Sequence, residues 1–311
     1  SYRQPILIDP FFEEFTKSTG IEVNVLHAKK GLLERLLSEG ANTPADLVLT
    51  VDISRLSALA NAGLLQPVSS QILNMNIPSQ YRHPDGLWFG LTLRARVVYA
   101  HKSRVKDGDV ATYSDLTKPR FKGKICTRSG KHAYNLSLLA AVVDEKGEKA
   151  AEAWARGLKS NLARRPSGND RAQVKAIKEG LCDISLGNTY YMGKMATNKK
   201  NPEQKEWANA VRLLFPKLGK KGTHVNISGA AMTKHAKNKD NAKKLLEFLS
   251  DNVAQKMYAD QNFEYPVKSG VAWSPMVKSW GSFFPSDVNL ATIAKYRLKA
   301  TKIMDRVNFD G

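Results

Sequence analysis

Cysteine and histidine are scarce in this sequence, which limits the metal sites that it can build. The 311 residues include two cysteines, Cys126 and Cys182, and six histidines. Two thiols cannot form a four-thiolate zinc site, and no two histidines stand at the helical spacing of a metal pair. We expect most histidines to lie at the surface. The cysteines form either one disulfide or two reduced, buried thiols, and the sequence leaves both open.

Long apolar runs and hydrolytic motifs are also absent. No run approaches the roughly 20 apolar residues that a membrane span needs. The sequence has no Gly-x-Ser-x-Gly, no His-Glu-x-x-His, no Gly-Lys-Ser/Thr phosphate loop and no Gly-x-Gly-x-x-Gly. We therefore expect a protein that is not an enzyme. No signal peptide opens the chain at Ser1, and we expect that a targeting segment has been removed.

Acidic residues are few relative to basic ones. There are 48 Lys and Arg against 29 Asp and Glu, a net charge of +19. Such a charge suggests nucleic-acid binding. The basic residues, however, are spread over the whole chain, and their densest runs lack the interleaved aromatic residues that stack on bases. We expect no nucleic-acid partner and keep nucleic-acid binding as an alternative; a basic surface also suits an anionic membrane or partner.

Apolar periodicity alternates between helix and strand in both halves of the chain. This alternation predicts α/β units with parallel sheets covered on both faces. The expected helices cover residues 9–20, 32–40, 53–63, 129–142, 149–158, 169–180, 240–249, 252–261 and 289–304. The expected strands cover residues 21–25, 46–50, 88–99, 124–126, 183–186, 210–215 and 224–227.

The extended segments near Arg94 and Val225 are expected to cross between two lobes. No Gly-, Ser- or Pro-rich linker separates the halves. The predicted N-terminal lobe comprises residues 1–95 and 223–270, and the predicted C-terminal lobe comprises residues 96–222 and 271–311. Lobes joined in this way commonly close over a ligand.

Two adjacent tyrosines, Tyr190 and Tyr191, follow a predicted buried strand and the turn Gly187-Asn188. Positions just past strand ends are where α/β proteins place ligand-binding groups. At a turn both hydroxyls can point at one place, whereas on a regular helix or strand they diverge. A tyrosine pair is more often one core ring and one surface ring, so the dipeptide alone does not decide.

The run from Gly187 to Lys194 resembles the ligand loop of periplasmic ferric-binding proteins of the transferrin-like periplasmic binding class. The resemblance covers nearly the whole chain, and its specific part is the tyrosine pair with Asn188, together with Tyr134. It implies a periplasmic-binding-protein type II fold, with two α/β lobes joined by crossing hinge strands. Further segments resemble the family in the same order: residues 1–5, 45–49, 93–99, 128–135 and 262–267.

The resemblance implies that Tyr134, Tyr190 and Tyr191 bind Fe(III) in a cleft between the lobes. Fe(III) is small, highly charged and oxygen-seeking. A free phenol has a pKa of about 10 and is a poor anion at neutral pH, but an adjacent cation overturns that preference. Three phenolates cancel the charge of the metal without carboxylates. They also favour Fe(III) over Fe(II), which gives a release route by reduction.

The sequence departs from the family pattern at its start. Many relatives carry His-Tyr or a similar ligand pair where this chain has Gln4 and Pro5. The resemblance implies that a small anion, carbonate or bicarbonate, fills the open metal positions. Arg3 is expected to hold it because a guanidinium fork fits a planar oxyanion. The other residues expected at the anion are Tyr2, Arg94 and Arg96. Relatives usually also have a strand just before Ser1, which is missing from this sequence.

Ser129, Gly130, Asn169 and Asn188 match positions that surround the site in relatives, and we expect them to support it. The resemblance further implies a periplasmic monomer that delivers Fe(III) to an inner-membrane ABC permease. An alternative on the same fold is a carrier of an organic cation of the polyamine or thiamine type, with Tyr190 and Tyr191 in an aromatic cage. The sequence shows no clear acidic cluster, which counts against that alternative.

Overall fold

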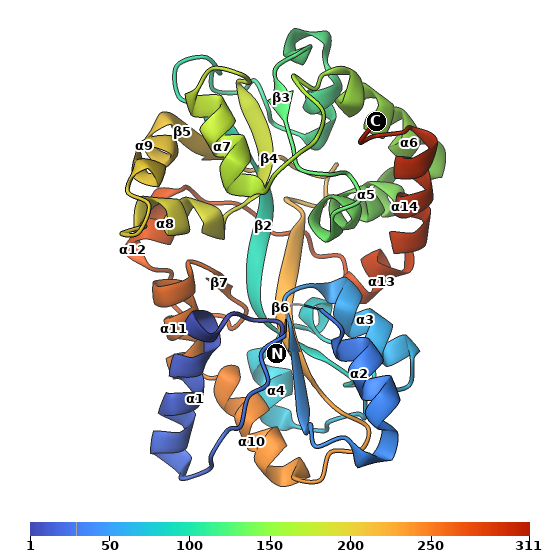
Figure 1. Cartoon of the computed structure of the whole chain (residues 1–311), viewed down its shortest axis with the longest axis vertical. Coiled ribbons are helices and arrows are strands. Elements are labelled where there is room, and N and C mark those ends of the chain that lie inside the picture. Colours follow the sequence, from blue (N-terminus) through green and yellow to red (C-terminus); the bar gives the residue numbers. More distant parts are fainter. Residues whose placement is uncertain (29) are drawn as a thin grey trace. The chain divides into compact units, whose positions relative to one another are not determined.

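The chain forms two compact units in a computed structural model, which describes residues 1–28 and 30–311. Strands β2 (Phe89–His101) and β6 (Val225–Met232) contribute residues to both units (Figure 1). The lobe boundaries predicted above stay a prediction. Unit 1 comprises Ser1–Leu93, Ile227–Ser274 and Asn289–Ala291, and unit 2 comprises Arg94–Asn226, Pro275–Val288 and Thr292–Gly311.

Unit 1 packs helices around the sheet order β1-β6-β2. Strand β1 (Leu47–Thr50) runs antiparallel to β6, and β7 (Tyr265–Pro266) runs antiparallel to β2. Helix α1 packs on α10 and α11 through apolar rings: the ring centroids of Phe11 and Tyr258 lie 4.3 Å apart. The helices are α1 (Pro5–Thr19), α2 (Leu32–Glu39), α3 (Ile53–Asn61), α4 (Gln71–Asn76), α10 (Lys239–Leu249) and α11 (Asn252–Asn262).

The start predicted for the first helix is wrong. Helix α1 begins at Pro5 rather than at Asp9. Proline is tolerated at the first helical position, and Ile8 is fully buried together with Phe11, so the apolar face starts a turn earlier than expected. The predicted end is confirmed: Gly20 closes the helix in the left-handed region, with φ 72°.

The strand predicted at residues 21–25 is also wrong. The exposure of this segment does alternate, since Ile21, Val23 and Val25 are half-buried between exposed neighbours. The segment next to it and β1 are bonded instead by the first residues of the sequence: the Ser1 amino group donates to the main-chain oxygen of Leu26 at 2.7 Å, and the Tyr2 N–H donates to that of Leu49 at 2.9 Å. Among the described residues, residues 21–25 and β1 form no strand pair, and both line a cavity of about 840 Å³.

Unit 2 is built on β2, which runs antiparallel to β4 (Ile184–Asn188) and β5 (Val211–Leu214). Strand β3 (Ile125–Cys126) pairs parallel with β4. The helices within this unit are α5 (Ala133–Lys146), α6 (Glu148–Ser160), α7 (Asp170–Lys178), α8 (Tyr190–Ala196), α9 (Glu203–Ala210), α12 (Pro275–Ser279) and α14 (Arg297–Arg306). Helix α13 (Leu290–Lys295) begins in unit 1 and ends in unit 2.

The expectation of parallel sheets is wrong for both units. The pairs β1–β6, β2–β4, β2–β5 and β2–β7 are antiparallel, whereas β3–β4 is parallel. The reason is that β1 pairs with β6, and β4, β5 and β7 pair with β2, so that every antiparallel pair includes one of the two strands shared by the units. In unit 2, α7 packs on β4, and α14 packs on α5 and α6 (Figure 1).

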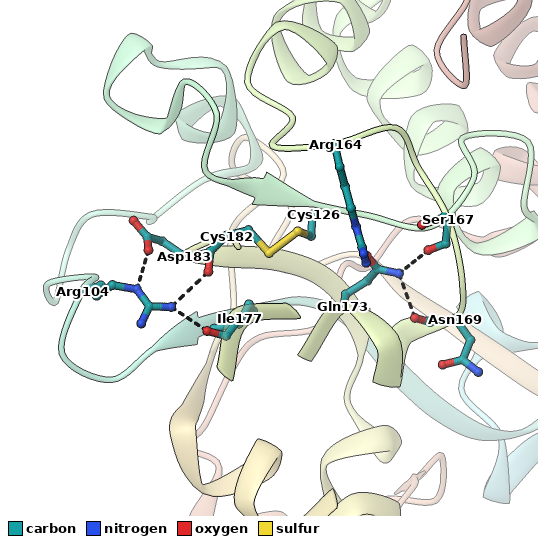
Figure 2. Close-up of a disulfide and its surroundings, with 9 residues drawn as sticks. All are labelled: Arg104, Cys126, Arg164, Ser167, Asn169, Gln173, Ile177, Cys182 and Asp183. Carbon is teal, nitrogen blue, oxygen red and sulfur yellow. Dashed lines mark hydrogen bonds and ion pairs between the residues drawn. A yellow bond between two sulfur atoms is a disulfide. The ribbon is translucent and has the colours of Figure 1, made fainter. Parts of the chain in front are cut away.

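Cys126 and Cys182 form a disulfide that ties β3 to the segment just before β4 (Figure 2). Their Cα atoms lie 5.9 Å apart, and both residues are buried. Beside the disulfide, Arg104 donates to the main-chain oxygens of Ile177 and Cys182 at 2.6 and 3.1 Å. The structure thus decides for the bonded state. No helix within residues 1–28 and 30–311 is long and apolar enough to cross a membrane.

Candidate metal site

The two adjacent tyrosines follow directly on a buried strand of unit 2. All five residues of β4 are buried, and Asn188 at its end pairs with Arg96 of β2. Thr189 continues the register, because its N–H donates to the main-chain oxygen of Ala95 at 3.1 Å. Tyr190 then begins α8. The turn predicted at Gly187-Asn188 is therefore wrong: both of these residues belong to β4, and the two tyrosines lie in the first turn of α8.

The rings of the three predicted metal ligands lie close together. The Tyr134 and Tyr190 hydroxyl oxygens are 3.4 Å apart. The rings of Tyr190 and Tyr191 stack, with centroids 4.3 Å apart and planes at 29°. Stacking keeps these two neighbours from diverging, so the structure brings all three phenol rings together.

The electrostatics of the phenols favour the neutral form while no cation is present. Burial raises the pKa of Tyr190 well above its ordinary value, and the nearby phenols of Tyr134 and Tyr191 raise it further. Burial also raises the pKa of Tyr191, and the Asp170 carboxylate adds to that effect. Like charges so close repel one another. Three phenolates at this spacing consequently require a strong cation among them.

Guanidinium groups surround the tyrosines. The Cζ atoms of Arg94, Arg96 and Arg128 lie 5.5, 5.8 and 5.3 Å from the centroid of the Tyr134 ring. The Cζ atom of Arg171 lies 5.5 Å from the Tyr191 ring centroid. Arg94 lowers the pKa of Tyr190 and Arg128 lowers that of Tyr191, although burial outweighs both effects. The cluster thus consists of neutral phenol oxygens with positively charged guanidinium groups beside them.

Asp170 holds two of these guanidinium groups. Its carboxylate is fully buried and accepts from Arg96 Nη1 at 2.8 Å and from Arg128 Nη1 at 3.1 Å. Arg96 also donates to the side-chain oxygens of Asn188 and Asn135, at 3.1 and 2.7 Å. The main-chain N–H of Asn188 donates to Asp170 at 2.9 Å. This network fixes the strand end from which the tyrosine pair starts.

Close packing behind Asn188 explains why residue 187 is a glycine. A Cβ atom at Gly187 would lie 2.4 Å from the ring of Tyr99. The Tyr99 ring therefore packs directly on the β4 backbone, and its hydroxyl donates to the main-chain oxygen of Asn188 at 2.7 Å. The strand end is held on both sides, by Asp170 and by Tyr99.

Ser129 and Gly130 hold a carboxylate of the chain itself. The Ser129 hydroxyl donates to Asp310 at 2.5 Å, and the Gly130 N–H donates to the same carboxylate at 2.7 Å. The helix predicted to begin there starts four residues later, at Ala133, because the His132 side chain caps it by accepting from the Tyr134 N–H at 3.2 Å. The two residues thus anchor the turn that leads to Tyr134.

Asn169 acts as the predicted helix cap, since its side chain accepts from the Ala172 N–H at 3.1 Å at the start of α7. The cap places the next residue, Asp170, at the first helical position. Asn169 itself is exposed. Its structural contribution to the site is therefore the positioning of Asp170.

Tyr2 and Arg3 belong to unit 1. Arg3 is buried, forms an ion pair with Glu264 and lies with its Cζ atom 5.4 Å from the Tyr258 ring centroid. The Tyr2 hydroxyl accepts from the Leu32 N–H at 2.8 Å, at the start of α2. The anion-binding role of these two residues stays a prediction.

Sequence reasoning missed three residues of the network, namely Asp170, Arg128 and Asn135. Asp170 lies in the helix expected over residues 169–180, and a buried carboxylate at a helix start carries no distinct sequence pattern. The expectation that most histidines lie at the surface does not hold for His224, which is buried. Its ring nitrogen Nε2 forms a hydrogen bond with the Ser137 hydroxyl at 3.0 Å. Burial lowers the pKa of His224 to about 3, with Arg96 and Arg94 adding to the effect.

Other kinds of metal site find no support in the described part of the chain. No group of three or more His, Cys, Asp or Glu side chains there could hold a metal ion. The phenol cluster is a different donor set. Phenolate oxygens are hard anionic donors, which suit a small, highly charged cation.

Comparisons with known proteins identify the family of the chain and its fold. A model of the family described as "Bacterial extracellular solute-binding protein" matches residues 42–287. Iron uptake protein A1 of Synechocystis sp. is 44% identical over 299 residues, which cover 96% of this chain and 83% of that protein. The likeness to solved structures extends over the whole chain.

Ferric iron-binding protein A of Mannheimia haemolytica, solved in an open conformation, is 51% identical with a TM-score of 0.95, over 100% of this chain and 97% of that one. A Trichodesmium protein solved in complex with iron and citrate ligands is 43% identical with a TM-score of 0.95, over 99% and 98% of the two chains. The predicted periplasmic-binding-protein fold is thereby confirmed.

Proposed function

Because the chain belongs to the bacterial extracellular solute-binding protein family, we propose that it captures Fe(III) through the phenolates of Tyr134, Tyr190 and Tyr191 and delivers it to an ABC permease. The observation that carries the proposal is the convergence of the three phenols in unit 2. Relatives that are named for iron uptake and ferric iron binding support the choice of cargo.

The charge of the bound cation decides whether the phenols lose their protons. Tyr190 and Tyr191 have raised pKa values, so protons hold these groups neutral until a cation competes. Fe(III) supplies three positive charges, and three phenolates cancel them. A divalent cation would leave a net negative charge in a partly buried place, which is unfavourable. The cluster therefore selects a trivalent cation by charge as well as by donor type.

A synergistic anion completes the proposed site. Three phenolates leave about half of an octahedral shell open, and Arg94 and Arg128 lie beside Tyr134 to neutralise an oxyanion there. We propose carbonate or bicarbonate. The Trichodesmium relative was solved with iron and citrate ligands, so citrate can compete with carbonate for the same position and must be left out of the test. Loading without bicarbonate, in a citrate-free buffer, should weaken iron binding.

The proposed location is the periplasm. The Cys126–Cys182 disulfide is typical of an oxidising compartment, and the matching family is described as bacterial extracellular solute-binding proteins. A thiol pair would be kept reduced in most cytosols. Delivery to a permease and action as a monomer belong to the same proposal.

The test is the visible spectrum of the protein during titration with a ferric chelate. Phenolate-to-iron charge transfer should give an orange-to-purple band. Tyr190→Phe, Tyr191→Phe and Tyr134→Phe should each shift and weaken the band and lower the affinity. Tyr296→Phe, between α13 and α14 in the same unit but outside the cluster, is the matched control and should leave the band unchanged. A colourless titration of the unaltered chain would refute the proposal.

A further inference from the structure

The net charge of the chain is confined to one of its two units. Unit 1 contains 14 basic and 14 acidic residues and is neutral; unit 2 contains 34 basic and 15 acidic residues and carries the whole +19. Composition alone does not reveal this division, because each unit is assembled from several segments. A charge of this size attracts an extended anionic surface over roughly a Debye length, about 8 Å at physiological salt.

Unit 2 carries three aromatic rings on neighbouring segments. Phe284 has 83% of its surface exposed, more than any other large hydrophobic residue found exposed in residues 1–28 and 30–311. Beside it in sequence, Phe283 is half-buried and stacks on the half-buried Phe215, with ring centroids 4.7 Å apart and planes at 6°. A single exposed apolar residue is ordinary, but here it adjoins a stacked and partly exposed aromatic pair.

The rings lie on two segments of unit 2, residues 215–223 and Pro275–Val288, whose backbones are hydrogen-bonded to each other. The Thr223 N–H donates to the main-chain oxygen of Phe284 at 2.8 Å, and the Ser286 N–H donates to that of Thr223 at 2.9 Å. At Gly222, where φ is 81°, a Cβ atom would lie 2.4 Å from the Phe284 oxygen, so the backbones are in direct contact. The rings are therefore presented by a fixed backbone.

Three exposed lysines stand on the same two segments: Lys217, Lys220 and Lys278. Within the described residues, no carboxylate lies within ion-pair distance of any of the three, whereas their neighbour Lys221 pairs with Asp144 and Glu145. We call the three rings and these three lysines the aromatic–basic edge. Its positive charge is not neutralised by the chain itself.

We propose that the aromatic–basic edge binds the surface of an anionic lipid bilayer. Aromatic rings insert favourably at the level of lipid headgroups, and lysines beside them attract anionic headgroups. The charge of unit 2 as a whole adds to this attraction, which suits a laterally extended surface better than a small acidic pocket on a protein. The proposal is independent of iron binding, because none of these residues is part of the tyrosine cluster.

The experiment is sedimentation of the full chain with vesicles. We expect binding to phosphatidylcholine vesicles that contain about a third phosphatidylglycerol, and none to phosphatidylcholine alone. Binding should fall steeply between about 0.05 and 0.3 M salt. Absence of binding to the anionic vesicles at low salt would overturn the proposal.

Matched variants separate the edge from net charge. Lys217→Glu with Lys220→Glu should reduce the bound fraction at least about tenfold more than Lys237→Glu with Lys239→Glu, an exposed pair in unit 1 that changes the net charge equally. Equal effects of the two pairs would overturn the assignment to this edge.

Phe284→Ser should weaken vesicle binding several-fold, whereas Ile6→Ser, at a unit 1 residue with 77% exposure, should not. If Phe284→Ser leaves vesicle binding unchanged and instead weakens binding to a detergent-solubilised permease, the rings serve a protein partner and the lipid proposal is wrong.

Discussion

Arg96 and Asp170 form an ion pair that is almost completely shielded from water. Nη1 of Arg96 lies 2.8 Å from Oδ2 of Asp170, and the two side chains are 3% and 0% exposed. A buried pair is a weak source of stability in itself, but removal of one partner leaves an uncompensated charge in a dry environment. Because Asp170 also bonds the backbone of Asn188, the pair links folding to the tyrosine site.

Asp170→Asn should therefore destabilise the protein strongly. It leaves the Arg96 and Arg128 charges without a carboxylate, and we expect a loss of about 3 kcal/mol or more in the free energy of unfolding. Urea unfolding of the iron-free protein measures it. The control is Asp260→Asn, which breaks the exposed Lys256–Asp260 pair and should cost under about 1 kcal/mol. Equal losses would contradict the prediction.

Iron loading should release protons. Each phenol that binds as a phenolate gives up one proton, and Tyr190 and Tyr191 hold theirs because their pKa values are raised. Apparent affinity should then rise with pH, by about a tenfold factor per pH unit for each phenolate formed. An indicator dye in weak buffer measures the release against a protein-free blank. Tyr190→Phe should release about one proton fewer; an unchanged count would exclude Tyr190 as a ligand.

His224 should make the protein sensitive to acid. Its pKa in the folded state is about 3, below the ordinary value near 6.5, so the unfolded chain takes up a proton that the folded chain refuses. This contribution to stability is complete above about pH 6.5 and is lost as pH falls from there towards 3, by about 1.4 kcal/mol per pH unit. Urea unfolding at several pH values measures the slope.

His224→Gln should flatten that pH dependence, since Gln keeps a polar group near Ser137 but does not titrate. His235→Gln alters an exposed histidine and is the control that should leave the slope unchanged. The prediction fails if both variants show the slope of the unaltered chain.

The disulfide should contribute to stability through the unfolded state. Cys126 and Cys182 are 56 residues apart in sequence, and closing a loop of that size is worth about 4 kcal/mol in the chain-entropy estimate. Replacing both cysteines with serine should lower the urea midpoint accordingly, with the dithiothreitol-reduced protein as a second measurement. A loss under about 1 kcal/mol would show that the unfolded chain is already compact there.

Local pattern predicted most of the elements of this fold. The Asn169 cap of α7 and the Gly20 end of α1 are found as expected, because capping depends on residues within one turn. Pairing depends on partners far away in sequence. The segment at residues 21–25 has the alternation of a strand, yet it pairs with no strand among the described residues.

The candidate site, too, could be predicted from the sequence only in part. The tyrosines at positions 134, 190 and 191 could be singled out from a resemblance in sequence, and the structure brings their rings together. The surrounding network could not be found, since Asp170, Arg96 and Arg128 meet only after α7 packs on β4. Nor does a sequence show that Arg3 is engaged by Glu264, 261 residues away.

Asp310 supports the turn before Tyr134 from a distant position in the sequence. Its carboxylate accepts from the Ser129 hydroxyl and the Gly130 N–H, five and four residues ahead of Tyr134, although Ser129 and Asp310 are 181 residues apart in sequence. Loss of this carboxylate would free both donors at the start of the segment that carries Tyr134. A substitution far from the tyrosines in sequence would thereby reach the proposed iron ligands.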